Sequence, residues 1–314
     1  MPEEKRYRIF SEEMKRSFGC RVHRISVDAG FTCPNRDGTA GTGGCIYCGG
    51  EGSGSFGIVP GLSVAAQIEH GKEIMTRKYK ARKFVAYFQP YSNTYAQVSK
   101  LRRLYDEALA VPDVVGLIVG TRPDCLPAEV LDLLAEYARR TWFWLELGLQ
   151  SPLDRTLSLI NRGHDFAAFK TAARGCRERG IRLSAHVILG LPGETREEML
   201  ATAGVLNGLK IDGVKLHLMH VMKGTELAAR YGRGEVRVMD RDEYVGLVCD
   251  FLELLNPEIV IQRLTGDGAR DFLLAPLWSL AKFEVLNTID NELLRRGTRQ
   301  GSRYVPQHGK TVDI

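Results

Sequence analysis

Between residues 22 and 221, apolar runs rich in valine, isoleucine, leucine and aromatic residues alternate with stretches of helical periodicity. Near-continuous apolar runs are typical of parallel strands that are covered on both faces. We expect six such strands, at residues 22–30, 83–90, 113–122, 142–150, 182–190 and 213–221. Six successive βα units predict an α/β protein, either a partial (βα) barrel or an open doubly wound sheet. No G-x-G-x-x-G follows the first strand, which disfavours a dinucleotide-binding sheet.

Local signals mark two of the helices between these strands. Thr195 and Glu198 form a capping box, in which each side chain bonds a free amide at the start of a helix. Asp165 is placed to cap the helix before the fifth strand.

The alternation ends after residue 224. We expect a helix at 241–255, a strand at 258–263, a glycine-rich loop and a basic final helix. The sequence therefore predicts a barrel over residues 1–224 and a small α+β extension over residues 225–314 that packs on it.

The amino terminus and the charge bear on location and partners. The first ten residues, MPEEKRYRIF, are charged throughout, which disfavours a signal or transit sequence. No apolar run approaches the roughly 20 residues that a membrane-spanning helix needs. We therefore expect a cytoplasmic protein without a membrane partner. The net charge of +5 is compatible with a polyanionic substrate, although many proteins that bind no nucleic acid share it.

Seven cysteines in a chain expected to be cytoplasmic point to metal ligation or buried thiols rather than to disulfides. Three of them, Cys33, Cys45 and Cys48, lie in the glycine-rich loop 31–57 that follows the first expected strand. Glycine lets the backbone wrap closely around a bulky group. Three thiolates can hold three irons of a [4Fe–4S] cluster and leave the fourth iron open for a substrate, whereas a cluster used only for electron transfer normally has four protein ligands.

Two alternatives stay open for this loop at the level of sequence. One is a structural zinc site completed by His23 or Cys20, but zinc prefers four ligands, commonly in two pairs, and no second pair is present. The other is a surface loop with incidental thiols. Cys125, Cys176 and Cys249 fall at helix-associated positions, where free cysteine behaves as a small buried hydrophobic residue.

Longer motifs cover nearly the whole chain, namely VDAGFTCPNRDG, GGCIYC, FQPYSNTYA, VGTRPDCLP, ELGLQS, NRGHD, HVILGLPGET and DGVKLHLMHVMKGTELA. With the cysteine loop and the six βα units, they resemble the radical S-adenosylmethionine (SAM) superfamily, and more closely its YhcC/YtqA family. The chain is also similar to the radical-SAM half of the Elongator catalytic subunit, which shares TRPD, ELG-x-QS, NRGH and DG-x-KL. It differs from that relative at Gly120, where the relative has glutamate. No counterpart of the Elongator acetyltransferase domain is seen, so acetyl-CoA is not expected as a group donor.

The resemblance implies a partial (βα)6 TIM-like barrel, a [4Fe–4S] cluster on Cys33, Cys45 and Cys48, and SAM as a second cofactor. In the superfamily, the amino and carboxylate groups of SAM chelate the open iron. An electron delivered to the cluster then cleaves SAM into methionine and a 5′-deoxyadenosyl radical that abstracts hydrogen. The resemblance also implies an electron donor of the flavodoxin or ferredoxin type. The cofactors supply the chemistry, while the protein positions and shields them.

Candidate SAM-binding residues lie near the carboxyl ends of the expected strands, which face the reaction centre in barrels of this kind. By resemblance, Gln150 contacts ribose or methionine atoms, Arg162 the carboxylate, and Tyr47 the adenine. The planar fork of arginine suits a carboxylate, and the alternative for Arg162 is a surface ion pair. For Arg122 and Asp124 the alternative is a local salt bridge. The full candidate set is Tyr47, Gln89, Arg122, Asp124, Gln150, Arg162, Leu189 and Gly190.

The catalytic candidates are His186, Lys215 and His217, in the fifth and sixth expected strands. Glu146 and His186 stand inside strands, and a carboxylate buried in a parallel strand is unfavourable unless it is paired. Two interpretations follow: a polar network with Lys215 that lines the reaction cavity, or a structural pair beneath the barrel.

The leading hypothesis is a radical SAM enzyme that modifies the 5-position side chain of the tRNA wobble uridine, because of the likeness to the Elongator radical half. A basic segment adds a little support for tRNA as the partner, through Arg295, Arg296, Arg299 and Arg303. A second hypothesis is radical chemistry on a small metabolite or tetrapyrrole. A third is a non-catalytic Fe–S electron carrier or a zinc-stabilised RNA-binding module, against which the three-cysteine motif argues.

Overall fold

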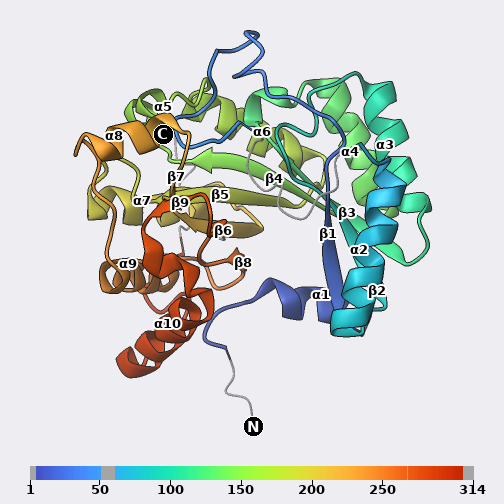
Figure 1. The fold of residues 1–314 in the computed structure, drawn as a ribbon. Coiled ribbons are helices and arrows are strands. Elements are labelled where there is room, and N and C mark those ends of the chain that lie inside the picture. Colours follow the sequence, from blue (N-terminus) through green and yellow to red (C-terminus); the bar gives the residue numbers. More distant parts are fainter. Residues whose placement is uncertain (1–4, 51–60, 267, 307–314) are drawn as a thin grey trace.

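The computed structural model describes residues 5–50, 61–266 and 268–306. Its main feature is a curved sheet of seven parallel strands in the order β1-β2-β3-β4-β5-β6-β8 (Figure 1). The strands are β1 (Val22–Val27), β2 (Lys83–Phe88), β3 (Val114–Thr121), β4 (Trp142–Gln150), β5 (Leu183–Leu189), β6 (Gly213–Leu218) and β8 (Val260–Arg263). The first six follow chain order, whereas a doubly wound sheet reverses its order at a switch point. The expected partial (βα) barrel is therefore confirmed.

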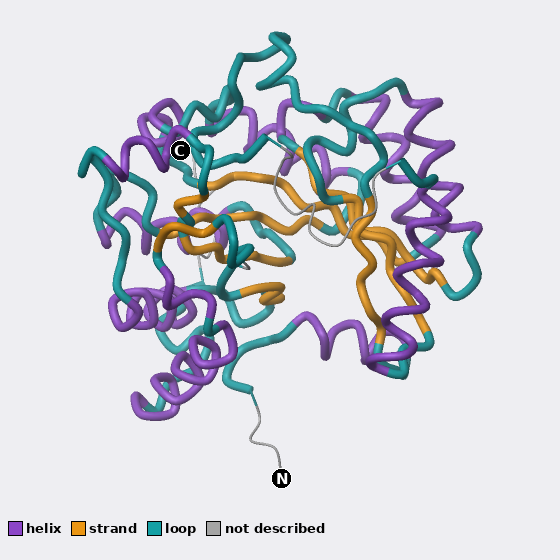
Figure 2. The backbone as a smooth tube through the Cα atoms, in the orientation of Figure 1, coloured by secondary structure: helices purple, strands orange, loops and turns teal. Residues whose placement is uncertain are grey.

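Helices join consecutive strands and cover the outer face of the sheet, as the tube in Figure 2 shows. The expected capping box is present, with Glu198 accepting from Thr195 N at 2.9 Å, and Asp165 caps its helix by accepting from Ala168 N at 2.8 Å. None of the described helices is long and apolar enough to cross a membrane. The connecting helices are α2 (Val64–Tyr79), α3 (Val98–Ala110), the 3-10 helix η1 (Pro123–Cys125), α4 (Ala128–Arg140), α5 (Asp154–Leu159), α6 (Phe166–Glu178), α7 (Arg196–Gly208), α8 (Glu226–Gly232) and α9 (Arg241–Leu254).

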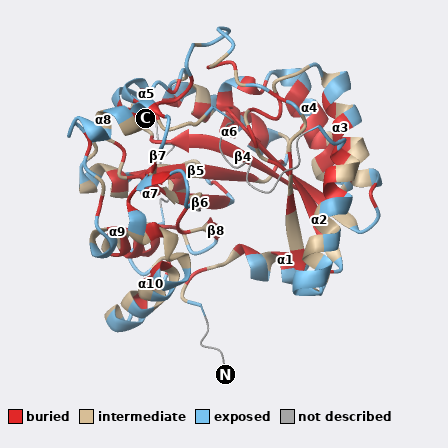
Figure 3. Ribbon diagram, viewed as in Figure 1, coloured by how far each residue is buried: buried red, intermediate tan, exposed pale blue. Residues whose placement is uncertain are grey.

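The two faces of the sheet pack against different layers. Outward-facing strand residues such as Val27 and Leu145 are buried beneath the helices, whose outer surfaces are exposed (Figure 3). On the inner face, Trp144 and its apolar neighbours pack against α1 (Phe10–Phe18), with the Phe10 ring centroid 5.6 Å from that of Trp144. Helix α1 contacts both β1 and β8, the two edge strands. It therefore closes the amino-terminal end of the half barrel.

The extension contributes more to the sheet than the sequence indicated. Strand β8 pairs with β6, so the sheet has seven strands rather than the six expected. Without β8, the outer edge of β6 would present unpaired backbone groups. The expected sixth strand is also shorter, because β7 (Val221–Met222) leaves the sheet and pairs antiparallel with β9 (Leu273–Ala275). The 3-10 helix η2 (Leu277–Leu280) and α10 (Lys282–Arg296) follow, while the domain boundary at 224/225 stays a prediction.

Candidate active site

The loop after β1 brings three cysteines to the carboxyl edge of the sheet. Cys45 is buried, and Cys33 and Cys48 are half-buried. The backbone turns tightly at both ends of the motif, with Cys48 N donating to Cys45 O at 2.9 Å and Arg36 N donating to Cys33 O at 2.8 Å. The loop expected at 31–57 extends beyond the described residues at positions 51–57.

Hydrogen bonds fasten this cysteine loop to the segment that follows α5. Asn161 Nδ2 donates to Gly44 O at 2.8 Å, and Ile46 N donates to Ile160 O at 3.0 Å. In return, the fully buried Asn35 donates through Nδ2 to Asn161 O at 2.6 Å. The NRGH motif at 161–164 is therefore hydrogen-bonded to the cysteine loop and holds it in place.

Arg162 places a buried positive charge against the loop. One guanidinium nitrogen, Nη1, lies 3.5 Å from Cys45 Sγ, and the other, Nη2, donates to Gly148 O on β4 at 2.9 Å. Burial alone raises the pKa of the Cys45 thiol, but the neighbouring Arg162 outweighs it and lowers that pKa. The side chain expected to bind SAM is thus adjacent to a cysteine of the motif, and it is not a surface arginine.

Arg122 and Asp124 form the local salt bridge that was the alternative at sequence level. The pair is bidentate, with Nε–Oδ1 and Nη2–Oδ2 distances of 2.9 and 2.6 Å. Arg122 also donates through Nη1 to Arg162 O at 2.7 Å. These contacts indicate that the Arg122–Asp124 pair holds Arg162 in place.

Two further SAM candidates lie beside this group. Gln150 ends β4 in the left-handed region (φ 70°), and a Cβ built on Gly148 would meet both Gln150 Nε2 at 2.6 Å and Arg162 Nη2 at 2.3 Å. Gln150 and Arg162 are therefore neighbours beside Gly148, where an added Cβ would force one or both side chains to shift. Tyr47 is close to Cys45, where burial and the thiol raise its pKa.

The remaining SAM candidates are Gln89, Leu189 and Gly190, and no described contact brings Leu189 or Gly190 to the cysteine loop. Gln89 follows β2 at the same edge of the sheet. Leu189 O accepts from Met219 N at 3.0 Å, and Gly190, at φ 87°, lies against Met219 and Met239. These two positions therefore line the β5–β6 side of the sheet edge.

The donor set at the loop fits the expected [4Fe–4S] cluster. Burial raises the pKa of the Cys48 thiol, while Arg36 beside it favours the thiolate. Arg36 and Arg162 thus offset the charge that three thiolates would bring. Asn35 Oδ1 is buried without a hydrogen-bond partner beside the same loop. Among the described residues, no three His, Cys, Asp or Glu side chains are gathered closely enough for one metal ion. In a cubane each thiolate binds a different iron.

Sequence reasoning missed Asn35 and Asn161 as site residues. Asn35 stands two positions after Cys33, and Asn161 directly precedes Arg162. Asn161 has a positive φ of 52°, a conformation that asparagine tolerates better than most residues. The available signal was that each asparagine stands close to a residue already chosen as a candidate. The hydrogen-bond partners of both asparagines are backbone carbonyls more than a hundred residues away, which the sequence does not indicate.

A buried polar network crosses the inner face of the sheet below the cysteine level. Glu146 Oε2 accepts from Tyr87 Oη at 2.7 Å, from His186 Nε2 at 2.9 Å, and from Lys215 Nζ. Lys215 Nζ also donates to Tyr87 Oη at 2.7 Å and is only 1% exposed. The ring of His217 lies beside that of His186, with centroids 5.3 Å apart. The three catalytic candidates are therefore brought together, with Lys215 at the buried end.

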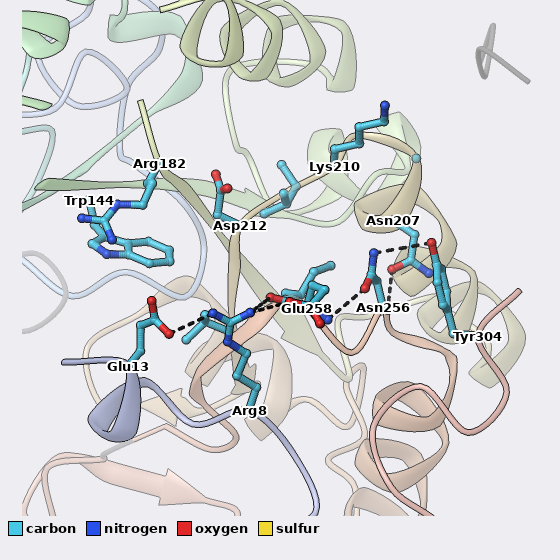
Figure 4. Close-up of a pocket in the computed structure, with 14 residues that line it drawn as sticks. Arg8, Glu13, Trp144, Arg182, Asn207, Lys210, Asp212, Asn256, Glu258 and Tyr304 are labelled. Atoms are coloured by element: carbon cyan, nitrogen blue, oxygen red, sulfur yellow. Dashed lines mark hydrogen bonds and ion pairs between the residues drawn. The ribbon is translucent and has the colours of Figure 1, made fainter. Parts of the chain in front are cut away.

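A cavity of about 500 Å³ lies at the opposite, amino-terminal edge of the strands (Figure 4). Arg8 in its wall is already bound to Glu13 at 2.9 Å and to Glu258 at 2.8 Å. The Arg182 guanidinium lies 5.1 Å from the ring centroid of Trp144. None of the cavity's lining residues belongs to the expected site, so the cavity is separate from the cysteine loop.

Comparison with protein families decides the class of this protein. Residues 36–206 match the model of the Radical SAM superfamily. The chain belongs to the radical SAM superfamily. Residues 211–295 of this radical SAM enzyme match the Radical_SAM C-terminal domain, which spans β8, β9 and nearly all of α10.

Individual relatives agree with this assignment. YtqA of Bacillus subtilis (strain 168) is 44% identical over 96% of this chain and 94% of its own length. A tRNA uridine(34) acetyltransferase of Dehalococcoides mccartyi is 31% identical over 52% of this chain and 36% of its own length. The structure of an amino-terminally truncated Elp3 from the archaeon Methanocaldococcus infernus covers 89% of this chain and 64% of that one, with a TM-score of 0.66 and 17% identity. The expected likeness to the YhcC/YtqA family and to Elongator is confirmed.

As a radical SAM enzyme, the protein uses a [4Fe–4S] cluster and SAM. The expected enzyme class and both cofactors are confirmed, and the carrier and zinc-module hypotheses are set aside. When bound, the two cofactors together supply an organic radical by one-electron cleavage of SAM. Cys33, Cys45 and Cys48 would hold the cluster, with Arg36 and Arg162 balancing its charge.

Replacing Cys33, Cys45 or Cys48 by serine is expected to remove the cluster, because a hydroxyl is a far poorer ligand for iron than a thiolate. Anaerobically reconstituted wild-type protein should hold about four irons per chain and give an EPR signal on reduction. Cys125→Ser and Cys176→Ser are matched controls, because both thiols are buried outside the loop, and they should retain iron. Loss of iron from folded Cys125→Ser protein would contradict the ligand assignment.

Replacing Gly163 by alanine is expected to weaken the hydrogen bonding between the cysteine loop and the NRGH motif. Gly163 has a φ of 73°, and a Cβ there would stand 2.5 Å from Asn35 Oδ1, so Asn35 must leave Asn161 O. Gly180→Ala is the control, since it has a similar φ of 68° and open space around the added Cβ. Both variants should lose about 1–2 kcal/mol of unfolding free energy from backbone strain. Only Gly163→Ala should also release iron faster to a chelator, and equal release rates would refute this role.

Proposed function

We propose that this radical SAM enzyme acts on tRNA and modifies the side chain at the 5-position of the wobble uridine. The observation that carries the proposal is the 31% identity, over half of this chain, to an enzyme named for uridine 34 of tRNA. The sequence shares TRPD and NRGH with the Elongator radical half, and these motifs supply Arg122 and Arg162 at the cysteine loop. Because these shared motifs lie at the cysteine loop, they support the same radical chemistry, and with it the same class of substrate, in the two proteins.

The charge on the inner face of the sheet supports a polyanionic substrate. Lys215 on β6 is within electrostatic reach of Arg24 on β1 and Arg263 on β8, and its ion-pair partner is Glu146. Positive groups at a concave site attract phosphate-rich ligands over long distances.

The basic carboxyl-terminal segment supports tRNA binding less than the sequence suggested. Arg296 is bound to Asp250 at 2.6 Å and to Glu292 at 2.7 Å, and Arg295 is bound to the same Glu292 at 2.7 Å. Gln300 N donates to Arg6 O at 2.8 Å, so the segment also ties the two ends of the described chain together. We therefore expect tRNA to approach the carboxyl edge of the sheet, where the cysteine loop lies.

Roles for individual residues follow from this proposal. Arg162 and Gln150 contact SAM, with the guanidinium serving the carboxylate as well as Cys45. Tyr47 packs beside the adenine. The electron is delivered by a donor of the flavodoxin or ferredoxin type. These assignments rest on the position of the side chains around the cysteine loop.

The wobble nucleosides of cells lacking the gene test this proposal. At least one uridine derivative modified at the 5-position should disappear or be replaced by a precursor, measured by mass spectrometry of digested tRNA. The wild-type gene should restore it, and the Cys45→Ser gene should not, because that variant lacks a cluster ligand. An identical nucleoside profile in an organism that expresses the protein would refute the tRNA proposal. The second candidate, radical chemistry on a small metabolite or tetrapyrrole, would then be tested on the metabolite profile of the same cells.

A further inference from the structure

Glu146 is an unusual residue for the centre of a parallel strand. It is fully buried on β4, and its Oε2 accepts hydrogen bonds from three different elements, through Tyr87 on β2, His186 on β5 and Lys215 on β6. Burial raises the pKa of this carboxyl, but Lys215 and His186 outweigh it and lower that pKa well below its usual range. Glu146 is therefore an ionised acceptor in the interior of the sheet.

An ionised carboxylate can only accept hydrogen bonds, which fixes the state of its imidazole partner. His186 must carry its proton on Nε2, the nitrogen that lies 2.9 Å from Glu146. No described residue bonds the other nitrogen of His186, Nδ1. This atom is also not one of the buried side-chain atoms without a hydrogen-bond partner, so it is not fully buried. The His186 side chain is 20% exposed, whereas that of Lys215 is 2% exposed. Nδ1 of His186 is therefore the open end of the network.

A second imidazole extends this open end. The ring of His217 lies 5.3 Å from that of His186, and its Nε2 is buried without a hydrogen-bond partner. An imidazole nitrogen of this kind needs a partner that the described residues do not supply. His186 stands at the middle of β5, level with Lys215 on β6, and His217 lies two residues further along β6 toward the carboxyl edge, where the cysteine loop lies.

We propose that Glu146 is a positioning residue that holds His186 in its Nε2-protonated form, so that Nδ1 serves as the proton acceptor of the reaction. In this step a substrate X–H bond breaks, its electron pair stays on X, and a new N–H bond forms at Nδ1. No electron is transferred, and the charge that appears on the imidazole is stabilised by the Glu146 carboxylate. Lys215 keeps Glu146 ionised and does not meet the substrate. The inference needs the radical SAM site but not a tRNA substrate.

The charged surroundings of His186 set the expected pH dependence. The groups facing it are Glu146 on β4, Lys215 and His217 on β6, and Arg263 on β8. Burial lowers the pKa of His186, Lys215 lowers it further, and Glu146 raises it. His186 is thus neutral near pH 7, and its ability to accept a proton is lost as the pH falls through its pKa.

Nitrogen-15 NMR of histidine-labelled holoprotein, with its cluster oxidised, tests the geometry without any substrate. His186→Gln assigns the His186 signals by their absence. We expect the wild type to show Nε2 protonated and Nδ1 bare, and Glu146→Gln to mix the two tautomers. Because Glu146→Gln leaves Lys215 buried and unpaired, the neutral double variant Glu146→Gln/Lys215→Met provides a second folded protein for the same measurement. A protonated Nδ1 in the wild type would overturn the inference.

The rate of 5′-deoxyadenosine formation tests the function of the same pair. Extract of gene-deleted cells, divided into an RNA fraction and a small-molecule fraction, contains the accumulated substrate of either class. In the fraction that stimulates turnover, His186→Gln should lower the stimulated rate by about 10²–10⁴-fold. Glu146→Gln should move the acid limb of the pH profile to lower pH, because the carboxylate that raises the His186 pKa is gone, and Glu146→Asp should restore it in part. An unmoved acid limb would overturn the inference, while stimulation by the small-molecule fraction alone would refute only the tRNA proposal.

Discussion

The buried guanidinium of Arg162 is the contact on which the candidate site depends. It joins Cys45 in the loop after β1 to Gly148 on β4, and its own carbonyl is held by Arg122 beyond β3. A buried positive charge is unfavourable unless its partners are supplied, and here the cysteine loop and β4 supply them. A shift of the cysteine loop would separate the guanidinium from the Cys45 thiol. The order of the loop is therefore a consequence of electrostatics as much as of packing.

The inner face of the half barrel carries two charged layers, one above the other. In the upper layer, cysteine thiols lie next to arginine guanidinium groups, as Cys45 lies next to Arg162. The lower layer sets Glu146 against Lys215, and removing one partner of such a buried pair typically costs about 3–5 kcal/mol. Below both, the apolar side chains around Trp144 and helix α1 close the amino-terminal end. The cysteine loop lies at the carboxyl edge of the sheet, where barrels of this kind bind their ligands.

The sequence predicted those parts of the fold that local pattern encodes. Near-continuous apolar runs located β1 to β6, and the capping box at Thr195 located the start of α7. The strand expected at 258–263 is present as β8, but its place in the sheet was not predicted, because its pairing with β6 is a long-range contact. At the site, the cysteines were visible from their spacing. The contacts of Asn35 with Asn161, and of Arg122 with the Arg162 carbonyl, were not, because backbone carbonyls as partners leave no trace in a sequence.

Three cysteines and their arginine neighbours equip this chain to cleave SAM. The most direct measurement is the formation of 5′-deoxyadenosine and methionine by the reconstituted protein under a strong reductant and SAM, without oxygen. We expect the two products in equal amounts to each other, both from the wild type and from Cys176→Ser, whose thiol is buried on α6 away from the loop. We expect neither product from Cys45→Ser. Equal yields from Cys45→Ser and the wild type would contradict the assignment of Cys45 as a cluster ligand.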